Sequence, residues 1–284
     1  MSKTTGSAIM YINTPDGKRG CNDSMGTWLT SSAWALPEGC TWPGFEEWVL
    51  LQNTTNSQVG ATVTFLTPQG PVEGPYIAMS PNQRQSIRVN DFVASNDVST
   101  LVFTDAKNQE IAVERTMYIN TPDGRRGSHN ATGTVWGDAN WYLPEGCTLE
   151  GFDEWVLVMN PDPDNGVTVN VSFMSPNGLV GQVTESLAPG SRKTIHANTY
   201  THDSISTKVK ITGSSGSDPM VMCERAMYIN TPDKYGATDS LGIESFWLDM
   251  PAGSGYSGSS METNKAKAIK QKDKSKVVLD KWMR

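Results

Sequence analysis

Met10-Tyr11-Ile12-Asn13-Thr14-Pro15-Asp16 is the first of three copies of one heptapeptide, and the other two begin at Met117 and Met227. The starting points lie 107 and 110 residues apart. A segment that returns at a nearly fixed spacing indicates a tandem array, in which each repeat is one structural unit. The 284-residue chain is therefore expected to hold repeated domains of ordinary size rather than one unique globular unit.

Further blocks recur at the same spacing. Residues 34–41 match 141–148 around the shared words Leu-Pro-Glu-Gly-Cys-Thr. Apolar and small polar side chains alternate along 61–66 and its counterpart 169–174, which is the period of a half-buried strand. Pro-Gln-Gly or Pro-Asn-Gly follows each run and favours a hairpin turn. About six to eight such strands per repeat predict an antiparallel β-sandwich.

The expected fold is all-β, with two tandem antiparallel β-sandwich units of the immunoglobulin-like kind. A half-repeat segment lies at each end, and helix and disorder are the alternatives for a short Lys-rich C-terminal tail. The predicted divisions are 1–34 (leader and half-repeat segment), 35–140 (first β-sandwich repeat), 141–253 (second β-sandwich repeat with the terminal half-repeat), 254–260 (Gly/Ser linker) and 261–284 (basic tail). This pattern is that of a section of a longer array.

The net charge of −7 is unevenly distributed. Residues 261–284 carry a balance of +5, so the remaining 260 residues carry −12. An acidic body is a poor partner for nucleic acid, which needs a basic face. The tail is interpreted as a solvated appendage or as a segment that binds an acidic surface, its own or a neighbour's. We expect no transmembrane segment, because no run approaches about 18 apolar residues.

The four cysteines give no disulfide that recurs once per repeat. Cys40 and Cys147 occupy matching places, whereas Cys21 and Cys223 have no cysteine counterpart. Free buried thiols are the preferred interpretation, and a Cys21–Cys40 bridge is the alternative. No cysteine spacing is typical of a zinc site.

No residues stand out as catalytic. The paired acids Glu46-Glu47 and Asp153-Glu154 precede matching tryptophans, but neighbours on a strand point to opposite faces and cannot form a two-carboxylate hydrolase site by themselves. We therefore predict no enzyme and no cofactor. A hard cation such as calcium is the alternative at the recurring turn carboxylates, which are Asp16, Asp123 and Asp233.

Two other recurring sets have a structural and a functional interpretation. Repeated tryptophans either pack in the core or stack on sugar rings at a glycan-binding face, and these are Trp34, Trp141, Trp48 and Trp155. Repeated arginines and acids are expected to form structural ion pairs, and these are Glu114, Arg115, Glu224, Arg225, Arg84 and Arg192.

The blocks Trp-x-Leu-Pro-Glu-Gly-Cys-Thr, Gly-Phe-(Glu/Asp)-Glu-Trp-Val-Leu and Glu-Arg-x-Met-Tyr-Ile-Asn resemble an uncharacterised tandem repeat of exported, cell-wall-associated bacterial proteins of the actinobacterial type. The resemblance covers about residues 8–253. It implies a β-sandwich architecture and an extracellular or cell-surface location, and it carries no catalytic residues. The chain itself shows no signal peptide, because its first seven residues are polar and too few.

The expected function is that of a non-enzymatic extracellular structural repeat, acting as a surface spacer, a stalk or a head-to-tail filament subunit. Self-assembly would use the segment found near both ends, which is represented by Met10, Tyr11, Ile12, Met227, Tyr228 and Ile229. The alternative is a module that binds cell-wall glycan or another polysaccharide through the repeated tryptophans and tyrosines. A hydrolase is the third class.

Overall fold

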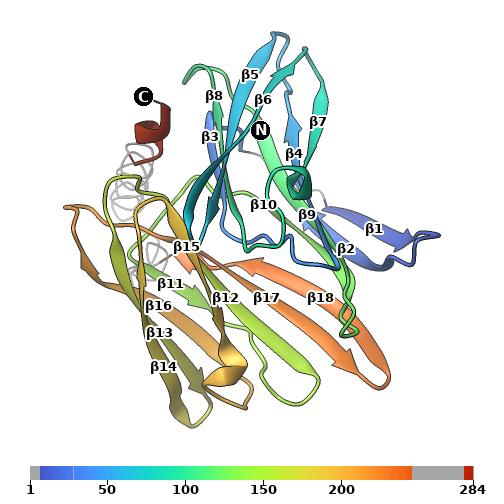
Figure 1. Ribbon diagram of the computed structural model, residues 1–284, viewed down its shortest axis with the longest axis vertical. Coiled ribbons are helices and arrows are strands. Elements are labelled where there is room, and N and C mark those ends of the chain that lie inside the picture. The colour runs from blue at the N-terminus through green and yellow to red at the C-terminus, as the bar shows by residue number, and fades with distance from the viewer. Residues whose placement is uncertain (1–6, 28, 245–277, 284) are drawn as a thin grey trace, which may run out of the picture.

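The computed structural model describes residues 7–27, 29–244 and 278–283 (Figure 1). Strands dominate the described residues, and every strand pairs with its neighbours in antiparallel fashion. The expected all-β class is therefore confirmed. The predicted linker 254–260 and most of the predicted tail lie outside the described residues.

The first repeat supplies two four-stranded sheets. One has the order β3-β8-β5-β6 and contains β3 (Ala33–Leu36), β5 (Val59–Thr67), β6 (Gly70–Met79) and β8 (Ser99–Thr104). The other has the order β10-β9-β4-β7 and contains β4 (Phe45–Gln52), β7 (Arg84–Arg88), β9 (Ala112–Asn120) and β10 (Arg126–Thr132).

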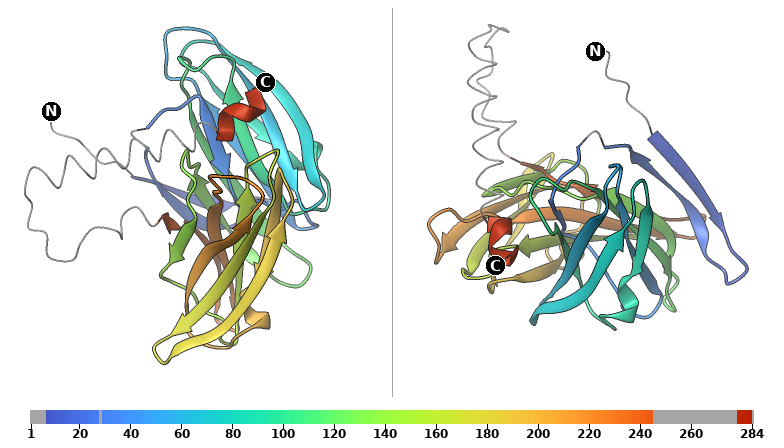
Figure 2. Two further views of the ribbon diagram at one scale, coloured as in Figure 1. Left: turned by 90° about the vertical axis from the view of Figure 1, so that its left-hand side faces the viewer. Right: turned by 90° about the horizontal axis from the view of Figure 1, so that it is seen from above.

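The second repeat follows the same plan. One sheet has the order β14-β13-β16-β11-β19 and contains β11 (Asn140–Leu143), β13 (Val167–Ser175), β14 (Gly178–Leu187), β16 (Ser206–Ser214) and β19 (Ile243–Glu244). The other has the order β15-β12-β17-β18 and contains β12 (Phe152–Asn160), β15 (Ser191–His196), β17 (Met222–Thr231) and β18 (Lys234–Leu241). A separate hairpin of β1 (Ser7–Asn13) and β2 (Arg19–Met25) stands at one side of the molecule (Figure 2).

Local sequence explains the strands and the turns between them. Along β4, burial alternates residue by residue, so Glu47 and Val49 face inward while Glu46 is partly exposed. The predicted Pro-Gln-Gly and Pro-Asn-Gly turns close the β5–β6 and β13–β14 hairpins. Gly70 and Gly178 have φ values of 119° and 104° there, a region that favours glycine.

The hydrophobic cores link the sheets and also link the repeats. One cluster joins side chains from both sheets of the first repeat, including Trp34 and Phe65 from one sheet and Val49 from the other. The cluster of the second repeat also takes in Ala33, Leu66 and Leu101 from the first. The two repeats therefore share part of one hydrophobic core. Figure 1 shows their sheets arranged next to one another at different angles.

Helices are short throughout the described parts of the chain. They are the 3-10 turns η1 (Val89–Asp91), η2 (Ala197–Thr199) and η4 (Asp280–Met283). Within the described residues, no helix has the length and the apolar character needed to cross a membrane.

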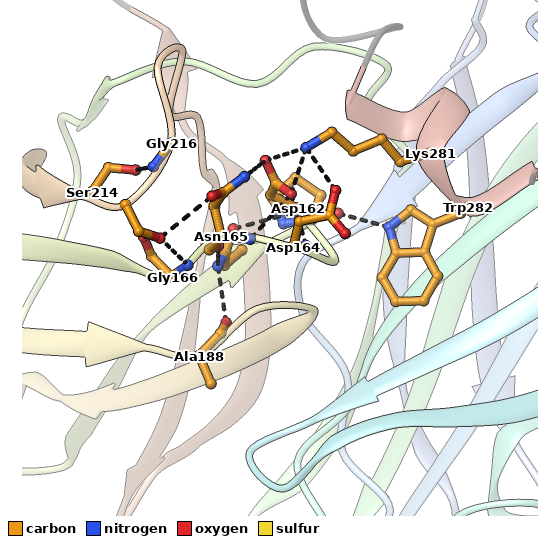
Figure 3. A network of polar contacts seen from close by, with 12 residues as sticks. Asp162, Asp164, Asn165, Gly166, Ala188, Ser214, Gly216, Lys281 and Trp282 are labelled. Carbon is orange, nitrogen blue, oxygen red and sulfur yellow. Dashed lines mark hydrogen bonds and ion pairs between the residues drawn. The ribbon is translucent and has the colours of Figure 1, made fainter.

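The last described residues of the tail dock on an acidic loop of the second repeat (Figure 3). Lys281 Nζ lies 2.7 Å from Asp162 Oδ1 and 3.3 Å from Asp164 Oδ2. The Trp282 indole N–H donates a 2.7 Å hydrogen bond to the Pro161 carbonyl, and Leu279 joins the core. The described end of the tail is thus helical and packed on the chain's own acidic loop, which favours the second interpretation over a solvated appendage.

The shared core predicts that a first-repeat side chain helps to hold the second repeat. We expect Leu66→Ala to lower the free energy of unfolding by about 2–5 kcal/mol, because Leu66 is fully buried and its removal leaves a cavity. Chemical denaturation measures this. Leu179→Ala is the matched control, since Leu179 is 60 % exposed and should change stability by less than about 0.5 kcal/mol. Equal effects of the two substitutions would contradict the shared core.

Candidate functional site

The candidate site is a buried charge cluster where the two repeats meet. Arg115 on β9 is completely buried, and its guanidinium forms ion pairs with three carboxylates from separate segments. Glu38 follows β3 in the first repeat, whereas Glu224 on β17 and Asp239 on β18 belong to the second. Arg115 Nη2 lies 3.3 Å from Glu224 Oε1 and 2.5 Å from Asp239 Oδ2. The guanidinium fork thereby ties the two repeats together.

His129 on β10 completes the cluster. Its Nδ1 atom lies 3.2 Å from Asp239 Oδ2, and its Nε2 atom lies 3.6 Å from Glu38 Oε1. Burial opposes charging of the imidazole, but the two carboxylates outweigh it and raise the pKa of His129. Burial likewise opposes ionisation of Asp239, yet His129 and Arg115 lower the pKa of that carboxyl to about 2. These shifts favour the charged forms of both groups.

A second buried carboxylate recurs in each repeat beneath the Leu-Pro-Glu-Gly-Cys loop. Glu47 and Glu154 are both fully buried. A Cβ atom on Gly39 or Gly146 would lie within 2.6 Å of their carboxyl oxygens, so the loop needs glycine there. The Cys147 N–H donates a 2.6 Å hydrogen bond to Glu154. Burial raises the pKa of Glu47 to about 8 and that of Glu154 to about 7.

Direct hydrogen bonds also cross the junction. Arg192 on β15 reaches into the first repeat, where its Nη1 donates to the Gly39 carbonyl at 2.8 Å and to the Val98 carbonyl at 2.9 Å. The Thr194 hydroxyl donates to Asp97 at 2.6 Å. A cavity of about 260 Å³ remains between these groups. Hydrogen bonds from Arg192 and Thr194 therefore connect the two repeats beside this cavity.

A wider cleft of about 650 Å³ lies on the first repeat, between the β1–β2 hairpin and strands β4, β7, β9 and β10. Its lining includes Leu50, Arg84, Glu114, Tyr118 and Asn130. Arg84 corresponds by its place in the repeat to Arg192, and Glu114 corresponds to Glu224. The cleft thus lies on the first repeat at the position where, on the second repeat, Arg192 and Glu224 contact the preceding repeat.

The cluster offers the one group of three metal-ligand side chains found within the described residues, which is Glu38, His129 and Asp239. Arg115 already forms ion pairs with both of the acids. A metal ion would have to displace a buried guanidinium or lie beside it, so the donor set fits a protein cation better than a metal.

The aspartates predicted as a cation site are held in three separate hairpin turns. Each accepts a hydrogen bond from the threonine hydroxyl two residues earlier, and these aspartates are Asp16, Asp123 and Asp233. Arg125 and the Thr121 hydroxyl lower the pKa of Asp123 to about 2. The role of the aspartate in each turn explains why it recurs, although the three aspartates do not come together as ligands of one cation.

The predicted glycan-binding tryptophans do not form one exposed face. Trp34 and Trp141 are buried, and their indole N–H groups donate to the Ile111 carbonyl at 2.8 Å and the Val221 carbonyl at 2.7 Å. Trp48 and Trp155 are partly buried. Trp48 donates to Glu46, and Trp155 stacks on His196 with ring centroids 4.2 Å apart. Buried indoles cannot stack on a sugar ring in the folded chain.

Some of the residues predicted to form ion pairs do so in the structure, and others do not. Arg115 and Glu224 pair with each other, and Arg225 pairs with Glu145 at 2.9 Å. Among the described residues, Arg84 and Glu114 form no ion pair, and Glu114 instead accepts a 2.6 Å hydrogen bond from Asn130. The predicted assembly segment is exposed at its first copy, where Tyr11 is 81 % accessible, and buried at its third, where Tyr228 is 5 % accessible.

Sequence reasoning missed Glu38, His129 and Asp239. His129 differs from its counterparts Asn22 and Thr238, so recurrence does not mark it. Glu38 does recur as Glu145, within Leu-Pro-Glu-Gly-Cys, and the recurrence of this acid together with that of Arg115 as Arg225 was the available signal.

Comparison with known proteins gives no family for the chain. No protein-family model and no curated protein matches it. A solved Thermotoga maritima protein (1070) has a TM-score of 0.33 at 15 % identity over 37 % of this chain and 93 % of its own. The Anabaena sensory rhodopsin transducer has a TM-score of 0.27 at 20 % identity over 31 % and 97 %. A Streptomyces avermitilis alpha-L-rhamnosidase has a TM-score of 0.23 at 11 % identity over 76 % and 28 %.

The charge cluster predicts a large effect from removing its cation. Arg115→Met should lower the free energy of unfolding by about 3–5 kcal/mol, because it leaves buried carboxylates without their partner. Arg88→Met is the control, since Arg88 forms an exposed pair with Asp91 and should change stability by at most about 1 kcal/mol. Denaturant titration of both variants decides, and a small loss in Arg115→Met would mean that the cluster does not hold the junction.

Glu47 predicts a pH dependence of stability. The folded chain keeps the Glu47 proton up to about pH 8, whereas an unfolded carboxyl loses it near its ordinary value of 4.5. Stability should therefore fall as pH rises between these values, by at most about 1.4 kcal/mol per pH unit for this group. Glu47→Gln should flatten that part of the profile. Glu46→Gln is the control, because Lys18 lowers the pKa of Glu46 against the effect of burial, and it should leave the slope unchanged.

Proposed function

We propose that this chain is a non-enzymatic structural repeat protein, in which coupled β-rich repeats form a rigid surface spacer, a stalk or a subunit of a head-to-tail filament. The observation that carries this proposal is the junction. Charged groups of the two repeats form ion pairs with one another in the interior, and these pairs orient the repeats. The residues are Arg115, Glu38, Glu224 and Asp239. Such a pairing specifies one relative orientation, since any other leaves a buried charge unpaired.

The same proposal includes the finer architecture, with two tandem antiparallel β-sandwich units over residues 35–140 and 141–253. The clusters that join paired sheets support it, because side chains of both sheets in each repeat meet in one core. The half-repeat before residue 35 then supplies the hairpin that a preceding unit would donate. An extracellular or cell-wall location, and bacterial surface adhesion, rest on the resemblance of the repeated blocks.

The experiment is a distance measurement across the junction. Nitroxides at Gln69 and Asn177, which lie at exposed hairpin turns of the two repeats, would be placed in a variant whose native cysteines are replaced. Pulsed electron spin resonance should give one narrow distance distribution. Arg192→Met should widen it, because the two hydrogen bonds from Arg192 cross the junction.

Arg84→Met is the matched control for this measurement. Arg84 holds the same place in the first repeat but is exposed, so its replacement should leave the distribution unchanged. A broad distribution in the parent protein would overturn the rigid spacer. Specific binding to cell-wall glycan in a pull-down would favour the alternative, a polysaccharide-binding module.

A further inference from the structure

The three heptapeptide copies form three β-hairpins that pack one on the next: β1–β2, β9–β10 and β17–β18. Pairing registers identify their equivalent residues, because Gly20, Gly127 and Gly236 each lie opposite the isoleucine of the heptapeptide. A Cβ atom on Gly20 would lie 3.1 Å from the Ser128 nitrogen, and one on Gly127 would lie 2.8 Å from the Ala237 nitrogen. The same close contact thus occurs twice.

Charged side chains repeat this relation at the turns. Lys18 lies over the Tyr118 ring at 5.4 Å and pairs with Glu46. Arg125 lies over the Tyr228 ring at 5.5 Å and pairs with Asp153 at 3.4 Å. The first and second hairpins therefore each cover the tyrosine of the next hairpin with a cation. The stack runs head to tail, so it presents one kind of face at its start and the complementary kind at its end.

The outer face of β1–β2 is the starting face, and it is uncovered. Ile9 is 62 % exposed and Tyr11 is 81 % exposed, and Cys21 and Asp23 on the same face are also exposed. The equivalent tyrosine of the third hairpin, Tyr228, is only 5 % exposed. Within the described residues, no hairpin lies against this apolar face.

The outer face of β17–β18 is the ending face, and it carries the covering groups. Lys234 holds the position of Lys18 and Arg125, since its carbonyl accepts the same threonine hydroxyl bond in each turn, and it is exposed. Among the described residues, a Cβ atom on Gly236 would meet no backbone atom within 4 Å, so none of them fills its close-contact position. Thr238 holds the position of Asn22, whose amide donates to Ser128 at 3.3 Å.

We propose that the β17–β18 hairpin of one copy packs on the β1–β2 hairpin of a second copy, with Lys234 over Tyr11 and Gly236 against Cys21. This inference rests on the proposed function and names the surfaces of its head-to-tail contact. The proposed partner is a second copy because equivalent hairpins of this chain already pack on one another twice, β1–β2 on β9–β10 and β9–β10 on β17–β18. A head-to-tail contact of this sort extends into a filament unless the rotation between successive copies closes it into a ring.

Thiol cross-linking tests the contact. Thr238→Cys would place a thiol opposite the native Cys21 of a second copy, as Asn22 faces Ser128 within the chain. A short bismaleimide should then give covalent dimers and longer products, severalfold above the parent protein. The products should disappear in the variant with Thr238→Cys and Cys21→Ser together.

Asn177→Cys is the matched control, because Asn177 is exposed at a hairpin turn away from the stack. Equal cross-linking from Asn177→Cys and Thr238→Cys would overturn the contact. Cross-linking through Cys21 alone would do the same, since it would mean that two starting faces meet. Lys234→Glu, added to Thr238→Cys, should reduce the products severalfold. If cross-linking fails while the distance distribution across the internal junction stays narrow, the spacer stands and only the intermolecular contact falls.

Discussion

The structure depends on one buried guanidinium. Arg115 has no access to water, and a charge in that position is stable only when carboxylates surround it. Those carboxylates come from the first repeat at Glu38 and from the second repeat at Glu224 and Asp239. Burial raises the pKa of Glu224 to about 7 even though Arg115 opposes it, so the acids of the cluster are not equivalent. The orientation of the repeats follows from this requirement.

The second repeat contains a reduced version of the same arrangement. Arg225 is buried and pairs with Glu145, whose side chain is 73 % exposed, whereas Glu38 in the first repeat is 3 % exposed. The difference between the two is the presence of a following repeat, because Glu224 and Asp239 close the cluster around Arg115. Thus the same recurring residues make a complete network at an internal junction and a partial one at the last described repeat.

Much of the local structure could be predicted from the sequence. The alternation along β4 placed Glu46 and Glu47 on opposite faces, and Pro-Gln-Gly and Pro-Asn-Gly form the predicted turns. These features depend on neighbours in the chain. The charge cluster depends on groups more than a hundred residues apart, such as Arg115 and Asp239, and no periodicity fixes which distant acid meets which cation. The docking of Lys281 on Asp162 was left open for the same reason.

Recurrence in the sequence and equivalence in the structure carry different information. Gly20 and Gly127 are glycine because their hairpins approach the next one too closely for a side chain, and Gly236 recurs at the equivalent position without such a contact among the described residues. Asn22, His129 and Thr238 occupy one equivalent position yet differ, because each faces different surroundings. His129 alone faces two acids, Glu38 and Asp239, and these carboxylates raise the pKa of its ring against the effect of burial. A position where the repeats differ in residue type can therefore indicate an internal junction more clearly than positions where the residue type is the same.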